Sequence, residues 1–341
     1  MIDLLPWHRL PLDELLARRN NLPHAMLIHG KQGIGKVEFA RAIAQSLLCE
    51  APEHGIACGT CNACGWYREG NHPDFRELVP ENLADDEADA DGSSDMSSTT
   101  ESSKEKKKSK QIKIDQVREL SGFMTLSTHR DGFRVLLIYP AETMNLAAAN
   151  ALLKTLEEPP PRTVILLVTD QMARLLATIR SRCQRILLTP PTVEVALKWL
   201  EGQNVVKPAT ALAMAGGAPL DAIQFADRTY QTERQAFLST LTDAQADYVA
   251  AAQSFEKSDL VNIVTWLQTW VADIVVAKLA GQIRHHVDQQ KEITRIAARV
   301  ELPKLFRYES ALRQTRRSIS HPLNARLLLE QLLVSYQQAI R

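Results

Sequence analysis

Four of the five cysteines in the chain fall within positions 49–64, a spacing typical of a metal site. Four thiolates complete the tetrahedral coordination of Zn²⁺, and short Cys-x-x-Cys turns bring such ligands together. With every coordination position filled by protein, the ion is expected to be structural rather than catalytic. The segment is too short and polar to fold without such a staple, which favours zinc over an iron–sulfur cluster or unligated cysteines. The predicted ligands are Cys49, Cys58, Cys61 and Cys64.

Two further side chains bear on this site. His72 follows the cluster and is an alternative ligand, although a loop histidine is the ordinary interpretation. Cys183 is distant in sequence and is interpreted as a small buried apolar side chain. Residues 1–19 contain acidic residues and prolines and no apolar core of a signal peptide, so we expect a cytoplasmic protein. Thiols stay reduced in that compartment, which again favours a metal site over disulfides.

A second group of residues has the spacing of a phosphate-binding loop. Residues 30–37 read GKQGIGKV, close to the pattern G-x-x-x-x-G-K-[ST]. Glycines at these positions let backbone N–H groups approach phosphate oxygens, and the lysine adds positive charge. The loop follows an apolar run and precedes a helical pattern, which is the context that the motif requires. The candidate phosphate-binding residues are Gly30, Gly33, Gly35 and Lys36.

This loop lacks two groups that ATP hydrolysis needs. Val37 stands where a serine or threonine hydroxyl would bind Mg²⁺. Tyr139 and Pro140 follow the next apolar strand, where acidic residues would hold the metal, and only Glu142 remains further on. We therefore expect no hydrolysis by this chain. Nucleotide binding at the loop and an empty relic that only begins a helix stay open as alternatives.

The elements that position these residues follow from apolar runs and their spacing. Continuously apolar strands separated by helices are typical of a parallel sheet that is covered on both faces. Strands are predicted at 24–29, 134–138, 164–169 and 185–189, and helices at 36–48, 115–126 and 145–158. After Pro190-Pro191 the pattern becomes helical to the end of the chain. The predicted division is an α/β domain at 1–190, a small helical domain at 191–228, and an all-helical domain at 229–341.

Segment 82–110 differs in composition from the rest of the chain. Its first part is rich in acidic residues and serine, and its last part, KEKKKSK, is basic. Too few apolar residues are present to offset the entropy of ordering it, so we predict a disordered surface insertion. Over the whole chain, 40 basic and 40 acidic residues cancel, which gives no global case for nucleic-acid binding. No uninterrupted run of 18 apolar residues occurs, so no membrane span is predicted.

Taken together, these motifs closely resemble the AAA+ subunits of the bacterial DNA polymerase III clamp loader. The resemblance rests on the phosphate loop, the four-cysteine insert, the segment NALLKTLEEPP at 150–160, and Ser181-Arg182-Cys183. Pro6-Trp7 and the HPLN segment at 321–324 match the two ends of such subunits. The likeness covers nearly the whole chain except 82–110. Because the ATP site is incomplete, the chain is similar to the delta-prime type rather than to the hydrolysing tau/gamma type.

The resemblance implies a specific fold and role. It implies an AAA+ domain with an inserted zinc module, a helical lid and a helical collar for assembly. Arg182, presented with Ser181, is implied to act as an arginine finger in the ATP site of a neighbouring subunit. The lid segment Gly216-Gly217-Ala218-Pro219 lacks the arginine that AAA+ ATPases usually carry there. No ATPase or polymerase activity of its own is expected, only membership of a DNA-directed DNA polymerase (a nucleotidyltransferase) that replicates DNA.

The implied partners are the tau/gamma and delta subunits, the sliding clamp, and primer–template DNA through the assembly. Two other functions are kept as alternatives: a stand-alone AAA+ ATPase or nucleotide switch, and a zinc-dependent nucleic-acid-binding module. For Arg182 the alternative is an ordinary surface ion pair. Trp266 and Trp270 lie one helical turn apart and are predicted to be collar core rather than a base-stacking surface. Arg313, Arg316 and Arg317 are predicted to form an exposed basic helix face.

Overall fold

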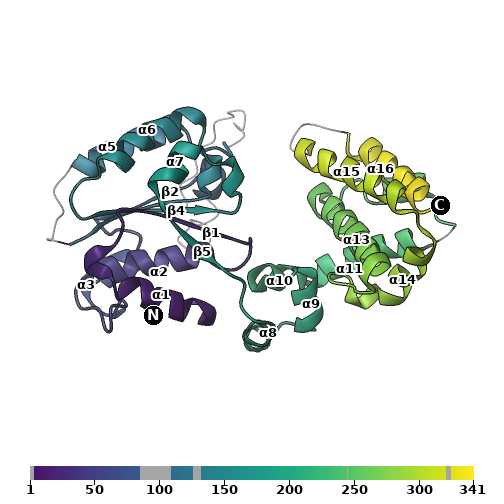
Figure 1. Ribbon diagram of the computed structural model, residues 1–341, viewed down its shortest axis with the longest axis horizontal. Coiled ribbons are helices and arrows are strands. Elements are labelled where there is room, and N and C mark those ends of the chain that lie inside the picture. The colour runs from purple at the N-terminus through teal and green to yellow at the C-terminus, as the bar shows by residue number, and fades with distance from the viewer. Residues whose placement is uncertain (1–3, 85–108, 126–131, 244, 320–323) are drawn as a thin grey trace, which may run out of the picture. The chain divides into compact units, whose positions relative to one another are not determined.

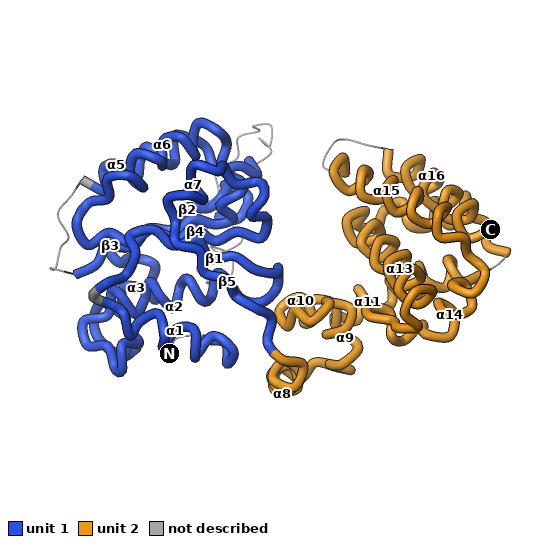
Figure 2. The backbone as a smooth tube through the Cα atoms, in the orientation of Figure 1, with its two compact units in different colours: residues 1–191 blue, residues 192–341 orange. Residues whose placement is uncertain are grey.

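The computed structural model describes residues 4–84, 109–125, 132–243, 245–319 and 324–341 (Figure 1). The chain forms two compact units, residues 1–191 and residues 192–341 (Figure 2). Most of the predicted insertion at 82–110, and positions 321–323 of the HPLN segment, lie outside the described residues. The further division of the second unit at 228 stays a prediction.

A parallel sheet forms the centre of the first unit. Five strands pair among the described residues, in the order β2-β3-β4-β1-β5, and every pair is parallel. The strands are β1 (Ala25–Gly30), β2 (Phe75–Leu78), β3 (Arg134–Ile138), β4 (Thr163–Thr169) and β5 (Gln184–Leu188). Strands β1, β3 and β4 are almost wholly buried, as expected for strands covered on both faces. This arrangement confirms the predicted parallel α/β fold.

Helices cover the two faces of this sheet (Figure 1). One face carries α5 (Ile114–Thr125), α6 (Leu146–Glu157) and α7 (Ala177–Arg182), and the other carries α1 (Arg9–Leu16), α2 (Lys36–Leu48) and α3 (Asn62–Arg68). Alternate strand residues, among them Leu27, Leu136 and Ile165, share one apolar core with α5, α6 and α7. Short 3₁₀ turns complete the unit: η1 (Pro6–His8), η2 (Arg19–Asn21), η3 (Ala141–Thr143) and η4 (Met172–Arg174).

The two edge strands depart from the sequence prediction. Strand β2 was not predicted, because FREL is short and two of its four side chains, Arg76 and Glu77, are charged. Strand β5 was predicted to be buried on both faces, and that was wrong, since most of its side chains are exposed. Among the described residues it pairs with β1 alone and ends the sheet, so its apolar Leu187 is left 62% exposed.

The second unit is helical throughout its described residues. It contains α8 (Val193–Gly202), α9 (Pro208–Met214), α10 (Pro219–Phe225), α11 (Arg228–Thr242), α12 (Tyr248–Ser254), α13 (Leu260–Ala280), η5 (Val287–Gln289), α14 (Gln290–Arg299), α15 (Leu302–Ser318) and α16 (Ala325–Ile340). Trp266 and Trp270 of α13 are buried in its main apolar core, as predicted. Their indole N–H groups donate to the hydroxyls of Tyr230 and Tyr336 at 2.6 and 2.9 Å.

Helix α13 also has the length and apolar composition of a membrane span. One face of it instead forms the centre of the helical core, through Ile263, Leu267 and Ile274. It also carries a fully buried carboxylate, Asp273, which accepts hydrogen bonds from the backbone of the loop at 284–286. We interpret α13 as a core helix.

Candidate metal centre and phosphate loop

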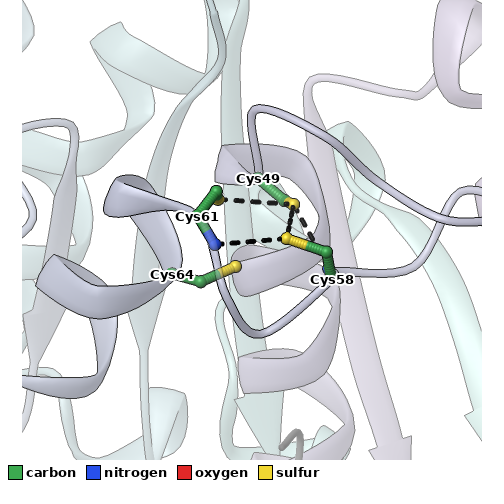
Figure 3. Close-up of side chains that lie close together, drawn as sticks. All are labelled: Cys49, Cys58, Cys61 and Cys64. Atoms are coloured by element: carbon green, nitrogen blue, oxygen red, sulfur yellow. Dashed lines mark hydrogen bonds between the residues drawn. The ribbon is translucent and has the colours of Figure 1, made fainter.

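The four predicted cysteines converge at one point of the first unit. Figure 3 shows their side chains drawn together from two helix ends and the loop between them. Cys49 directly follows α2, Cys61 is the N-cap of α3, and Cys64 lies in the first turn of α3. Their ligand atoms all lie within 4.8 Å of one another. The cluster is therefore compact enough to hold one metal ion.

Sulfur spacing and hydrogen bonding in the cluster fit a tetrahedral thiolate site. The Sγ of Cys49 lies 3.5 Å from that of Cys58 and 3.8 Å from that of Cys61. A tetrahedron with metal–sulfur bonds of about 2.3 Å places its sulfurs roughly 3.8 Å apart. Backbone N–H groups of Cys58 and Cys61 donate to the sulfurs of Cys49 and Cys58. Such donors stabilise thiolates bound to a cation.

Burial and hydrogen bonding shift the thiol pKa values of the cluster in opposite directions. Burial raises the pKa of Cys49, and that of Cys64 to about 12, so these thiols stay protonated at neutral pH without an ion. The hydroxyl and backbone of Thr60 donate to Cys58 and lower the pKa of this half-buried thiol to about 6. Thiols that coordinate a divalent ion are deprotonated outright, and the positive charge of the ion offsets the buried negative charges of the thiolates.

Contacts with α2 fix the cysteine segment in place. Arg19 of η2 donates to the carbonyls of Ser46 and Leu47 at 3.0 and 2.8 Å, where the last turn of α2 has no helical partners. The hydroxyl of Ser46 accepts the N–H of Ala57, and Tyr67 of α3 donates to the carbonyl of Arg41. The metal segment therefore forms one packed piece with the first helix of the sheet domain.

His72 lies outside the group of ligand atoms. Its ring is buried, its Nδ1 accepts the N–H of Asp74 at 3.1 Å, and it packs edge-on against Trp66. A histidine that orders the turn before β2 explains these contacts. Cys183 is buried in the apolar core between the sheet and α7, as predicted.

The phosphate loop connects β1 to α2 and is packed against the start of the chain. Gly35, the N-cap of α2, has a φ of +86°, a conformation that favours glycine. A Cβ at this position would lie 2.9 Å from Cε1 of His8. Trp7 donates its indole N–H to the carbonyl of Ile34 at 2.9 Å. Burial lowers the pKa of His8 to about 4, so the ring that covers the loop is neutral at physiological pH.

Lys36 does not extend into solvent. Its side chain is 4% exposed, and its ammonium forms an ion pair with Asp170, the residue that follows β4. The same ammonium donates to the carbonyl of Lys31 at 2.5 Å, within the loop itself. The backbone N–H of Asp170 donates in turn to Glu142 at 3.2 Å. Asp170 was not identified from the sequence. The feature that could have indicated it is an acidic residue directly after a buried strand, at the sheet edge where the phosphate loop lies.

Tyr139, which stands in place of a metal-binding acid, makes a different set of contacts. Its hydroxyl accepts from the guanidinium of Arg41 at 3.1 Å. That guanidinium also pairs with Glu77 of β2 at 2.8 Å and stacks over the Tyr139 ring. The end of β3 therefore carries an arginine contact where the motif expects acidic residues. The signal for this contact in the sequence was weak, because Arg41 lies within an ordinary amphipathic helix.

Arg182 lies at the last position of α7. Its guanidinium contacts Glu157 of α6 at 2.5 Å and donates to the carbonyl of Thr178 at 3.1 Å. Its side chain is 36% exposed, and that of Glu157 is 50% exposed. The hydroxyl of Ser181 donates to the same carbonyl at 3.0 Å. This arrangement holds the guanidinium at the surface of the sheet domain by bonds that are accessible to water.

Family models and curated relatives assign the chain to one family. Residues 13–192 match the family model described as DNA polymerase III, delta subunit, and residues 229–338 match its C-terminal counterpart. The DNA polymerase III subunit delta' of Pseudomonas aeruginosa PAO1 is 34% identical, over 98% of both chains. That of Haemophilus influenzae is 31% identical, over 82% of this chain and 76% of its own. A gamma-subunit-related protein from Thermotoga maritima aligns over 97% of this chain and 99% of its own, with 18% identity and a TM-score of 0.45.

Proposed function

Because the chain belongs to the family of DNA polymerase III delta-prime subunits, we propose that it is a non-hydrolysing subunit of the clamp loader. In this role it helps to load the sliding clamp onto primed DNA during replication. It supplies Arg182 in trans to the ATP site of an adjacent tau/gamma subunit. The delta subunit, the clamp and primer–template DNA are its other partners, and it acts in the cytoplasm.

The position of Arg182 is the observation that carries this proposal. An arginine finger must reach a neighbour's phosphates, so it needs an exposed guanidinium on a rigid element. Arg182 ends a helix that is anchored by the buried side chains of Ile179 and Cys183. Its partners on this chain are a half-exposed carboxylate and one carbonyl, and bonds of this kind to water-accessible groups are weak. A neighbour's polyphosphate, with several negative charges, competes well for such a side chain.

The contacts around the chain's own loop support the absence of hydrolysis. Val37 has no oxygen for Mg²⁺, and the end of β3 is occupied by the contact between Tyr139 and Arg41. Placing a divalent ion beside an arginine costs like-charge repulsion. The four-cysteine cluster has the composition of a structural zinc site, and we propose Zn²⁺ as its ion. That ion organises the segment after α2 and takes no part in nucleotide chemistry.

Replacement of Arg182 in the reconstituted complex tests this function. The chain is assembled with tau/gamma and delta subunits, and clamp- and DNA-stimulated phosphate release is measured for wild type and Arg182→Ala. Removal of a finger in trans is expected to slow the adjacent site by about 10³-fold or more. The total rate of phosphate release then falls by the fraction that the adjacent site contributes, while gel filtration shows an intact complex. Arg118→Ala, which removes an arginine that is 68% exposed on α5 of the same unit, serves as the control.

A third variant separates the finger from an ordinary ion pair. Glu157→Gln removes the carboxylate that holds Arg182 in the free chain and leaves the arginine in place. If Arg182 acts on a neighbour, this variant keeps the wild-type rate of phosphate release. If the ion pair itself matters, Glu157→Gln and Arg182→Ala lose activity together. Unchanged clamp loading and ATP hydrolysis in Arg182→Ala would refute the assignment.

A further inference from the structure

The carboxylate of Asp170 lies against the phosphate-loop lysine, and we propose that it acts as a built-in anion that takes the place of a bound phosphate. By occupying Lys36 it keeps the loop ordered without a ligand and excludes nucleotide from this chain. The inference deepens the non-hydrolysing role proposed above and rests on that role for its biological meaning. Its test needs only the isolated chain.

The first step is the state of the lysine. The side chain of Lys36 is only 4% exposed, and a buried ammonium must be paired with a charge and hydrogen-bonded. The Asp170 carboxylate supplies the charge and the carbonyl of Lys31 supplies a second acceptor at 2.5 Å. In a working phosphate loop, phosphate oxygens meet both needs. Here the chain meets them itself.

The second step is that Asp170 is held in position by its surroundings. It directly follows β4, which pairs with β1, so its backbone lies beside the strand that leads into the loop. Its own N–H donates to Glu142 Oε1 at 3.2 Å, and the next N–H, that of Gln171, donates to the hydroxyl of Thr169 at 3.1 Å. The ends of β1, β3 and β4 are thus connected through Lys36, Asp170 and Glu142.

The third step is the charge that a nucleotide would meet. Lys31 and Lys36 bring two positive charges to the loop, and Asp170 and Glu142 bring two negative charges. A polyphosphate must displace Asp170 from Lys36 and then remain beside a carboxylate that has lost its partner. Like charges at such distances repel strongly near a protein surface. Val37 offers no magnesium ligand that could offset this repulsion.

The fourth step is that the loop is packed from its other side. Leu5 and His8 lie against Gly35, and Trp7 donates to the carbonyl of Ile34. Leu5 and His8 are buried in this position, which leaves the loop ordered by apolar contacts as well as by the ion pair. Asp170 is therefore one part of a loop that satisfies its own interactions. Of the residues that pack against the loop here, Asp170 is the one whose negative charge contacts Lys36.

Removal of that single charge tests the proposal. ATP and inorganic triphosphate are titrated by calorimetry into wild type, Asp170→Asn, and Asp170→Asn combined with Lys36→Met, with and without Mg²⁺. Wild type is expected to bind both probes more weakly than about 1 mM. Asp170→Asn is expected to bind them at least about tenfold more tightly and without Mg²⁺, because one like charge is gone and Lys36 is released. The added Lys36→Met replacement abolishes that gain.

Asp115→Asn is the matched control, since it removes a carboxylate that is 78% exposed on α5 of the same unit. Equal affinities in Asp170→Asn and Asp115→Asn overturn the proposal, and so does binding by wild type tighter than about 10 μM. Circular dichroism checks folding, and Asp170→Ser replaces Asp170→Asn if the latter does not fold. If neither folds, the wild-type titration alone decides. None of these outcomes changes the expected effect of Arg182→Ala, so the two proposals fail separately.

Discussion

At the scale of single residues, buried polar groups of the second unit form a network that the sequence did not reveal. Arg234 is 1% exposed and bonds both carboxylate oxygens of Asp288, at 2.8 and 2.9 Å. It also donates to Nδ1 of His286, which assigns the proton of that ring to Nε2, opposite the hydroxyl of Thr269. His286 is therefore a neutral ring that serves as acceptor and donor at once.

This network makes the helical unit sensitive to acid. Burial and the neighbouring charge of Arg234 lower the pKa of His286 from 6.5 to about 3, against the opposing carboxylates of Asp273 and Asp288. Between these two pKa values the unfolded chain binds a proton that the folded chain does not. Stability therefore falls as the pH drops below 6.5, by at most about 1.4 kcal/mol for each pH unit from this group.

Urea unfolding at pH 7.0 and pH 4.5, followed by tryptophan fluorescence, measures this dependence. His286→Gln keeps an acceptor and a donor but cannot take up a proton, so its loss of stability on acidification is expected to be smaller than that of wild type. His54→Asn, at an exposed position with a φ of 50° that asparagine tolerates, is expected to follow wild type. Parallel curves for His286→Gln and wild type would contradict the assignment.

Residue types alone predicted what the phosphate loop lacks, but not what replaces it. Val37 and Tyr139 reveal the loss of a hydroxyl and of an acidic group, because the motif specifies the side chain expected at each position. Asp170 and Arg41 were not predicted, since their partners lie far away in sequence. Lys36 and Asp170 meet only after β1 and β4 pair, which is a property of the sheet and not of any local pattern.

At the scale of elements, local patterning located the buried strands and helices well and the edges poorly. Helix α2 begins after the N-cap Gly35, and helix α6 begins after the N-cap Asn145, whose side chain accepts the N–H of Ala148 at 2.8 Å. Strand β2 was not predicted, and β5 was located in the sequence but wrongly expected to be buried, because the exposure of an edge strand depends on which strands pair with it. The cysteine segment was predictable because its ligands lie close in sequence.

The metal that organises this segment gives the prediction that belongs to this scale. Elemental analysis of protein prepared without chelators is expected to show about one zinc ion per chain. Cys64→Ala removes a buried ligand and is expected to lose the ion and expose the segment around α3 to trypsin. The ion would join Cys49, after α2, to Cys61 and Cys64 of the α3 turn, so its loss is expected to loosen the segment between them.

Cys183→Ala is the matched control, since this thiol is equally reduced and buried but lies in the apolar core beside α7. It is expected to keep the zinc content of wild type. Iron in place of zinc would change the identity of the ion but not its ligands. Full occupancy in Cys64→Ala would contradict the four-cysteine site.

At the scale of the whole molecule, two compact units, residues 1–191 and 192–341, follow one another along the chain. Pro190-Pro191 ends the sheet domain, and everything described after it is helical. The apolar core of the helical unit comes from α11 to α16. In the sheet domain, residues 85–108 lie outside the described residues, between Ala84 and Ser109.

The two ends of that segment are joined by hydrogen bonds. The N–H of Asn82 donates to the carbonyl of Ser109 at 3.3 Å, and the N–H of Ser109 donates to Glu81 at 3.0 Å. Lys113 pairs with the other oxygen of Glu81 at 2.7 Å. These contacts hold the residues on either side of the segment together, so a short connection is expected to be enough to join them.

Replacement of residues 85–108 by Gly-Ser-Gly-Ser is therefore expected to leave the fold, the zinc content and assembly with partner subunits unchanged. If the segment is disordered, as its composition predicts, shortening it to four residues lowers the entropic cost of closing the loop by roughly 1.5 kcal/mol, so the melting temperature is expected to stay level or rise slightly. Glu81→Ala in the shortened chain tests the contacts that join the two ends of the segment, because it removes the acceptor of both Ser109 and Lys113. This variant is expected to lower the melting temperature. A shortened chain that melts well below wild type, or that fails to assemble, would show that residues 85–108 contribute to the folded domain or to its contacts.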